Sequence, residues 1–215
     1  MSSLPAAATR FLGGRVCLDF ANTVDWRTSD APEELVADYP ALLAWSARRG
    51  TMAAFTAARL RAAAARRPRA AARALREARV VRAEIWTLAE ALHRGAAVEL
   101  GPVNRRLAGL PPQPRLRREG RRYVHELPGA RLGEALWPVL WSLSALLSSD
   151  DAARVGRCRA EGCGWFFVDE SPNGSRTWCS SEGCGNRERA RRAYAKRTRP
   201  ARATPKPRRG HGSSP

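Results

Sequence analysis

Four cysteines near the C-terminus constrain the fold of this chain more than any other feature. Cys158, Cys163, Cys179 and Cys184 follow the spacing C-x4-C-x15-C-x4-C, and each pair lies in the same frame, C-x-x-E-G-C-G. Two close pairs commonly deliver four thiolates to one tetrahedral zinc ion. Because four cysteines fill the coordination shell and leave no position for water, we expect one structural Zn²⁺ and no zinc-based catalysis. The alternatives are two disulfides or four unrelated buried thiols.

The segments around the cysteines predict a small module of the treble-clef type. The residues between the two pairs read as strand, turn and strand, which predicts a hairpin over 165–178. After Cys184 the chain has strong helix formers and no breaker before Pro200, so Cys184 is expected at the start of a helix. We therefore expect a treble-clef-like zinc finger with a basic helix at residues 151–198.

Positive charge is concentrated in this C-terminal part. The whole chain has a formal net charge of +18, and Glu188 is the only acid between residues 186 and 209. Cations that neutralise phosphates release counterions, which supplies salt-sensitive affinity for DNA or RNA. The predicted nucleic-acid contacts are Arg176, Asn186, Arg187, Arg189, Arg191, Arg192, Lys196 and Arg197. The alternative is a solvated charged face that only keeps the protein soluble.

Residues 8–150 are predicted to form a mainly helical domain. Apolar residues and breakers predict helices over 38–50, 51–68, 69–94, 102–110 and 132–147. Asp38 suits the N-cap of the first of these, Gly50 its C-terminal end, and Thr51 the N-cap of the second. The apolar run 13–24 is expected to be buried and partly helical.

Two further segments depart from the helical pattern. Residues 115–127 alternate around Glu119-Gly120, which predicts a β-hairpin with a tight glycine turn, and the prolines of 111–114 enforce an extended break before it. The predicted fold class is therefore mainly α with a small β-hairpin (α+β). Residues 199–215 lack apolar surface and are expected to be a disordered basic tail.

Three polar residues interrupt the apolar segment near the N-terminus. Asp19, Asn22 and Thr23 are candidates to line a pocket for a small effector. The alternative is that they cap local turns or form hydrogen bonds within the core. The tryptophans of this domain are expected to lie in the core or at its rim, and Cys17 is expected to be buried.

The remaining composition argues against an enzyme and against a membrane protein. His93, His125 and His211 are scattered, and the chain has no serine-nucleophile motif or phosphate-cradling glycine loop. No apolar run approaches the roughly 18 residues of a membrane span, and the N-terminus does not resemble a signal peptide. We therefore expect a cytoplasmic protein.

The chain also resembles a known family. Cys184-Gly185-Asn186-Arg187 is the signature of the CGNR zinc finger, and "LDFANTV" from Leu18 is similar to the N-terminal ABATE domain that precedes this finger in bacterial proteins. The segment 38–50 and the segment 137–147 are similar to that domain as well. The resemblance implies a stress-induced transcription regulator with a helical domain and a DNA-binding finger, and it carries the four cysteines over as zinc ligands. Thr177 is a departure, because the family often has a second arginine there.

The sequence as a whole predicts a transcription regulator that binds DNA through its finger and basic helix. The N-terminal domain would then be a sensor or would form a homodimer. An RNA- or ribosome-associated zinc protein is one alternative, since phosphate contacts do not distinguish DNA from structured RNA. A protein-interaction module with a purely structural finger is the other.

Overall fold

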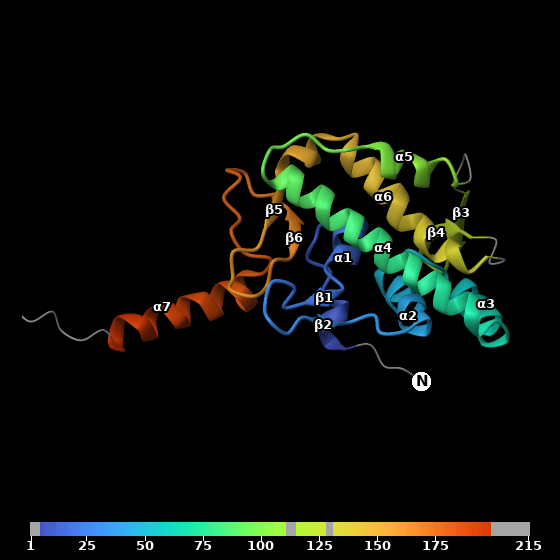
Figure 1. Cartoon of the computed structure of the whole chain (residues 1–215), viewed down its shortest axis with the longest axis horizontal. Helices are drawn as coiled ribbons and strands as arrows, with labels where there is room; N and C mark the ends of the chain where they lie inside the picture. Colours follow the sequence, from blue (N-terminus) through green and yellow to red (C-terminus); the bar gives the residue numbers. More distant parts are fainter. Residues whose placement is uncertain (1–4, 111–114, 128–130, 199–215) are drawn as a thin grey trace, which may run out of the picture.

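The longest helix, α4 (Pro68–His93), runs along the body of the molecule, and other helices pack against it (Figure 1). The computed structural model describes residues 5–110, 115–127 and 131–198. One face of α4 is buried, with Ala78, Val81, Ile85 and Leu88 recurring every three or four residues. Its helical partners include α1 (Val16–Ala21), α2 (Tyr39–Arg49) and α3 (Ala54–Arg66).

The boundaries of α2 follow its capping residues. The Asp38 carboxylate accepts a hydrogen bond of 2.7 Å from the Ala41 amide, and Gly50 adopts a left-handed φ of 77° at the C-terminal end. Both predictions are confirmed. Thr51, however, does not cap the next helix, because its hydroxyl donates to the Ser46 carbonyl (3.1 Å) and so closes the end of α2. Helix α3 begins three residues later, after Ala53.

Helices α5 (Gly101–Leu107) and α6 (Trp137–Leu147) complete the helical part. Helix α6 packs on α1 and α5, and a 3-10 helix, Leu132–Leu136, leads into it. Pro138 lies in the first turn of α6, where no helical hydrogen bond needs the N–H that proline lacks. The α-helix therefore begins at Trp137, later than the predicted residue 132. The proline break predicted at 111–114 and the tail 199–215 lie outside the described residues.

In the described part of the chain, three antiparallel strand pairs accompany the helices. The predicted hairpin is confirmed as β3 (Arg115–Glu119) and β4 (Arg122–Glu126), with Gly120 at a φ of 61° in its turn. The other pairs are β1 (Val24–Asp25) with β2 (Glu33–Glu34), and β5 (Val155–Arg157) with β6 (Phe166–Val168). The fold is therefore mainly α with short strand pairs, as predicted. None of the described helices is long and apolar enough to cross a membrane.

Strand β6 belongs to the main hydrophobic core although it lies beyond residue 150. Phe166 and Val168 are fully buried among the N-terminal helices. The Asn22 side chain donates to the Phe166 carbonyl (2.8 Å) and accepts from the Phe166 amide (2.9 Å), and the Trp165 indole donates to the Val24 carbonyl (2.8 Å). The predicted division at residue 150 therefore separates two parts that share one core.

Candidate metal centre and basic helix

The four late cysteines come together as the sequence predicts. All four are buried, and their Sγ atoms lie within 4.8 Å of one another. The Sγ atoms of Cys163 and Cys179 are 3.8 Å apart, and those of Cys179 and Cys184 are 3.4 Å apart. Zn–S bonds of about 2.3 Å in a tetrahedron place sulfur atoms roughly 3.8 Å apart. The arrangement fits one zinc ion, and it excludes four unrelated thiols.

Hairpin β5–β6 positions the first pair of cysteines at its tip. Cys158 directly follows β5, and its amide donates to the Trp165 carbonyl (2.8 Å) across the hairpin. Gly162 and Gly164 both adopt left-handed φ values, 75° and 65°, which bring the backbone round Cys163.

The second pair lies where the chain enters α7 (Asn186–Thr198). Cys184 sits in one turn of π helix, Ser181–Gly185, and the Ser180 hydroxyl caps this turn by accepting from the Gly183 amide (3.1 Å). The expected helix start at the last ligand is confirmed.

The predicted hairpin between the two pairs is wrong. Strand β6 pairs with β5 upstream, and residues 176–178 form no strand. Asp169 organises the intervening loop instead: its carboxylate accepts from the Ser171 amide (2.9 Å) and from the Arg176 amide (2.8 Å).

The arginine after the last cysteines contacts the metal centre directly. The Arg187 guanidinium lies 3.2 Å from the Cys184 sulfur and stacks over the Trp26 ring, with 4.4 Å to the ring centroid. A zinc ion with four thiolates carries a net charge of −2, so a cation at this place stabilises the centre. The sequence predicted a nucleic-acid contact here, and the structure gives Arg187 this local partner.

The geometry agrees with what comparison of the sequence finds. Residues 14–150, more than half of the chain, match ABATE, a family described as "Putative stress-induced transcription regulator". The chain belongs to the ABATE family. Residues 154–197 match the CGNR zinc finger, and this range contains all four cysteines. No relative was found among curated proteins. The predicted family resemblance is confirmed, and Cys158, Cys163, Cys179 and Cys184 form a potential metal site within the CGNR range that is consistent with one structural zinc ion.

The ABATE domain clamps the first cysteine pair of the CGNR finger through the loop after β1. The Thr28 amide donates to the Gly162 carbonyl (3.1 Å), and the Arg27 guanidinium donates to the Gly164 carbonyl (2.7 Å). A side chain on Gly164 would overlap the Thr28 methyl group. Sequence reasoning did not find this clamp, and the glycines of the frame C-x-x-E-G-C-G were the signal that a backbone approaches closely there.

Arg176 is a structural residue of the finger. Its guanidinium donates to the carbonyls of Leu12 (2.9 Å), Val168 (3.1 Å) and Cys179 (2.7 Å), and it stacks 4.1 Å from the Phe167 ring centroid. Its N–H donors are occupied by carbonyl groups of the protein. The structure therefore does not support the prediction that Arg176 contacts nucleic acid. The sequence did not reveal this role, because the acceptors lie on three separate segments and one of them, Leu12, is far away along the chain.

The remaining predicted contacts lie on α7 and fall into two groups, those with a partner within the protein and those without one. Arg191 pairs with Glu188 (2.8 Å) and Glu161 (2.9 Å), and Arg189 donates to the Asn186 side chain and to the Ser181 carbonyl (3.1 Å). These residues build the first turns of the helix. Within the described part of the chain, no hydrogen-bond or ion-pair partner is found for the side chains of Arg192, Lys196 and Arg197.

The effector pocket predicted at Asp19, Asn22 and Thr23 is not supported. All three are buried, and their polar atoms are used inside the core. Asp19 accepts from the Gly13 amide (2.8 Å) and from Arg49 (2.6 Å), while the Thr23 hydroxyl donates to the Phe20 carbonyl (2.7 Å). The alternative interpretation, hydrogen bonding within the core, is the one that fits.

The isolated cysteine and the tryptophans largely follow expectation. Cys17 is buried, and burial raises the pKa of its thiol to about 11, so it remains protonated. Trp45 is completely buried in the core. Trp26 is the exception, because it is 37% exposed, adopts a left-handed φ of 50°, and supports Arg187 at the metal centre.

Proposed function

We propose that the protein is a transcription regulator that binds duplex DNA through α7. The observation that carries the proposal is the exposure of this helix: Glu188 is its only buried residue, and it holds six cations and one acid. Figure 1 shows α7 projecting from the finger, away from the helical body. A basic helix presented in this way suits a polyanionic surface.

The isolation of α7 supports a partner of this kind. Helices of about 12–15 residues are marginal without tertiary packing, and α7 has 13 residues and no apolar face against the body. The zinc centre fixes its first turn, so it is held in place for docking. A helix of about 20 Å is long enough to lie in a major groove, which admits an α-helix.

Three cations, Arg192, Lys196 and Arg197, are available for phosphate contacts. Each contact contributes about 0.9 to the slope of log K against log salt concentration, so together they supply a slope of about −2.7. Binding of genomic DNA fragments is measured at several salt concentrations for the wild type and for Arg192→Ala/Lys196→Ala/Arg197→Ala. We expect the variant to bind weakly and the slope of log K against log salt concentration to become less negative by about 2.7.

A matched variant controls for net charge. Arg61→Ala/Arg66→Ala/Arg69→Ala removes the same charge from exposed positions on α3 and α4. It should leave DNA binding close to that of the wild type. Equal losses in both variants would contradict a specific role for α7, and preferential binding of structured RNA in competition would replace the DNA proposal by the RNA one.

The ABATE domain is proposed to sense a signal or to pair two chains, because one short helix gives modest affinity and two linked helices bind far more tightly. Such a regulator acts in the cytoplasm and catalyses no reaction. Light scattering of the DNA complex measures the number of chains. A strictly monomeric complex with a single-site footprint would exclude pairing.

A further inference from the structure

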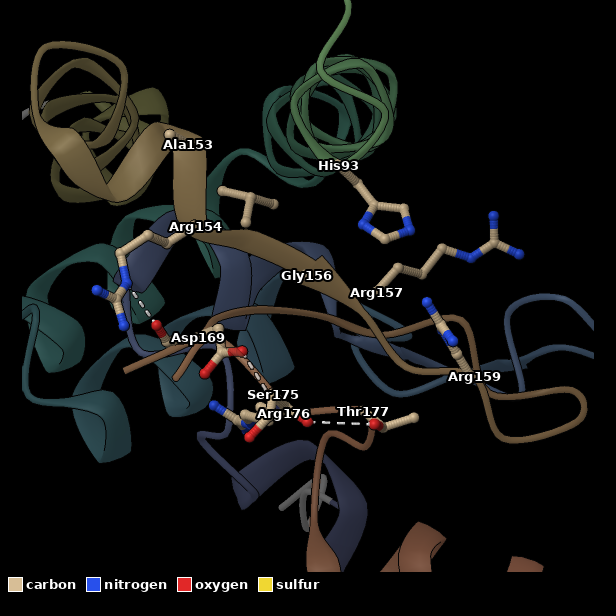
Figure 2. Close-up of a pocket in the computed structure, with 12 residues that line it drawn as sticks. His93, Ala153, Arg154, Gly156, Arg157, Arg159, Asp169, Ser175, Arg176 and Thr177 are labelled. Carbon is tan, nitrogen blue, oxygen red and sulfur yellow. Dashed lines mark hydrogen bonds between the residues drawn. The ribbon is translucent and has the colours of Figure 1, made fainter. Parts of the chain in front are cut away.

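A second cationic feature is a groove between the end of α4 and the finger (Figure 2). The groove has a volume of about 540 Å³. Its walls come from His93 on α4, from residues 153–157 and Arg159 on the way into the finger, and from the loop 174–177. Both the ABATE domain and the CGNR finger therefore contribute to it.

The walls are strongly positive. Arg154, Arg157, Arg159 and Arg176 line the groove, and Asp169 is the only carboxylate among the residues that line it. Arg154 donates to the main-chain carbonyls of Asp169 (2.6 Å) and Ser171 (2.7 Å). Carbonyls are neutral, so these bonds do not offset the charge of Arg154, and the carboxylate of Asp169 is the only acid of the lining that faces the four arginines.

One arginine and one imidazole of the groove are free to meet a ligand. Arg157 is held by both oxygens of Glu90 (3.0 Å each), but within the described residues no partner is found for the side chains of Arg159 and His93. Figure 2 shows His93, Arg157 and Arg159 beside one another at one end of the groove. A second hollow, of about 360 Å³, shares these three residues. Burial and the positive charge of Arg157 also lower the pKa of nearby Arg27.

We propose that this groove binds a small phosphorylated ligand, of the size of a nucleoside monophosphate, at the junction of the ABATE domain and the finger. The volume lies within the range of about 300–1,000 Å³ that is usual for small-molecule sites. One guanidinium group can donate two parallel hydrogen bonds to two oxygens of a phosphate. In this groove, Arg159 is the arginine whose donors are free for such a contact. The shortage of apolar side chains in the walls disfavours an uncharged effector.

The proposal is independent of DNA binding by α7. A groove of limited volume with walls from three segments suits a compact anion, whereas a DNA backbone needs an open, extended surface. Because the ligand would touch both His93 of the ABATE domain and Arg159 of the finger, its binding would stabilise the contact between the two parts of the chain.

The test is calorimetric titration of the full zinc-loaded chain with adenosine monophosphate, pyrophosphate and inorganic phosphate, with adenosine as the uncharged probe. We expect saturable binding at one site for at least one phosphate probe and none for adenosine. The order of the three phosphate probes tells whether the site takes a whole nucleotide or a bare phosphate. Arg159→Ala should weaken binding at least tenfold, and His93→Ala/Arg159→Ala further.

The control is Arg61→Ala, an exposed arginine of α3 far from the groove, which should change the affinity less than twofold. Both Arg159 and Arg61 are exposed, so these variants should keep their zinc and their melting temperature. Absence of saturable binding by every phosphate probe, or equal losses in Arg159→Ala and Arg61→Ala, would overturn the proposal. So would loss of DNA binding in Arg159→Ala without any small-ligand binding, because the groove would then be part of a DNA contact.

Discussion

Replacing Asn22 by alanine tests whether the finger and the helical domain form one folding unit. The Asn22 side chain satisfies both main-chain groups of Phe166 in the buried core. Alanine leaves a buried N–H and a buried C=O without partners, and each costs about 1–3 kcal/mol. Together they cost about 2–6 kcal/mol, and a central loss of roughly 4 kcal/mol lowers the melting temperature of a chain of this size by roughly 8–16 °C. Because Phe166 lies three residues after Cys163, zinc should also leave faster.

Two signals measured on one sample decide the outcome. Urea unfolding of Asn22→Ala followed by tryptophan fluorescence gives the free energy of unfolding, and zinc transfer to a coloured chelator gives the release rate. Asn104→Ala, on the exposed side of α5, is the matched control and should change neither. A loss below about 0.5 kcal/mol, or zinc release that stays at the wild-type rate, would refute the idea that β6 couples the two parts.

Three further predictions concern the finger and the hairpin. Cys184→Ser should lower zinc from one per chain to near zero by metal analysis, since it removes one of four ligands. Gly164→Ala should destabilise the protein in urea by more than Gly95→Ala, because both glycines have a φ of 65° but only the new methyl group at 164 overlaps Thr28. Burial lowers the pKa of His125 below its ordinary value of about 6.5, so the unfolded chain binds the proton first. The contribution of His125 to the stability of the protein is therefore present above about pH 6.5, and it is lost as the pH falls toward the pKa of His125 in the folded state. Melting curves at pH 5.5 and 7.5 measure this loss, which should be smaller in His125→Gln.

Local features of the sequence predicted much of the structure. The N-cap Asp38 and the glycine at position 50 act within a few residues, so α2 was predicted at both ends. The zinc ligands were predicted for a similar reason, because the spacing and repeated frame of the cysteines specify a metal site whatever surrounds it.

The contacts that join distant segments could not be predicted in this way. Both 165–168 and 176–178 have strand-like residues, and the choice of β5 as partner of β6 depends on the loop that Asp169 and Arg176 organise. Arg187 is exposed, as expected for a cation in a basic run, but it also contacts the metal centre. Its place at the Cys184 sulfur becomes visible only when the fold brings Trp26 alongside.

The burial of β6 in the helical core has a consequence for the geometry of any operator. The finger is anchored by Phe166 and Val168, so the direction of α7 is fixed relative to the ABATE domain and does not vary as it would on a flexible tether. If two chains pair through their ABATE domains, the separation of their two α7 helices is set by the protein. The DNA would then have to present its two half-sites at one constant spacing, and inserting a few base pairs between them would prevent the two α7 helices from binding at the same time.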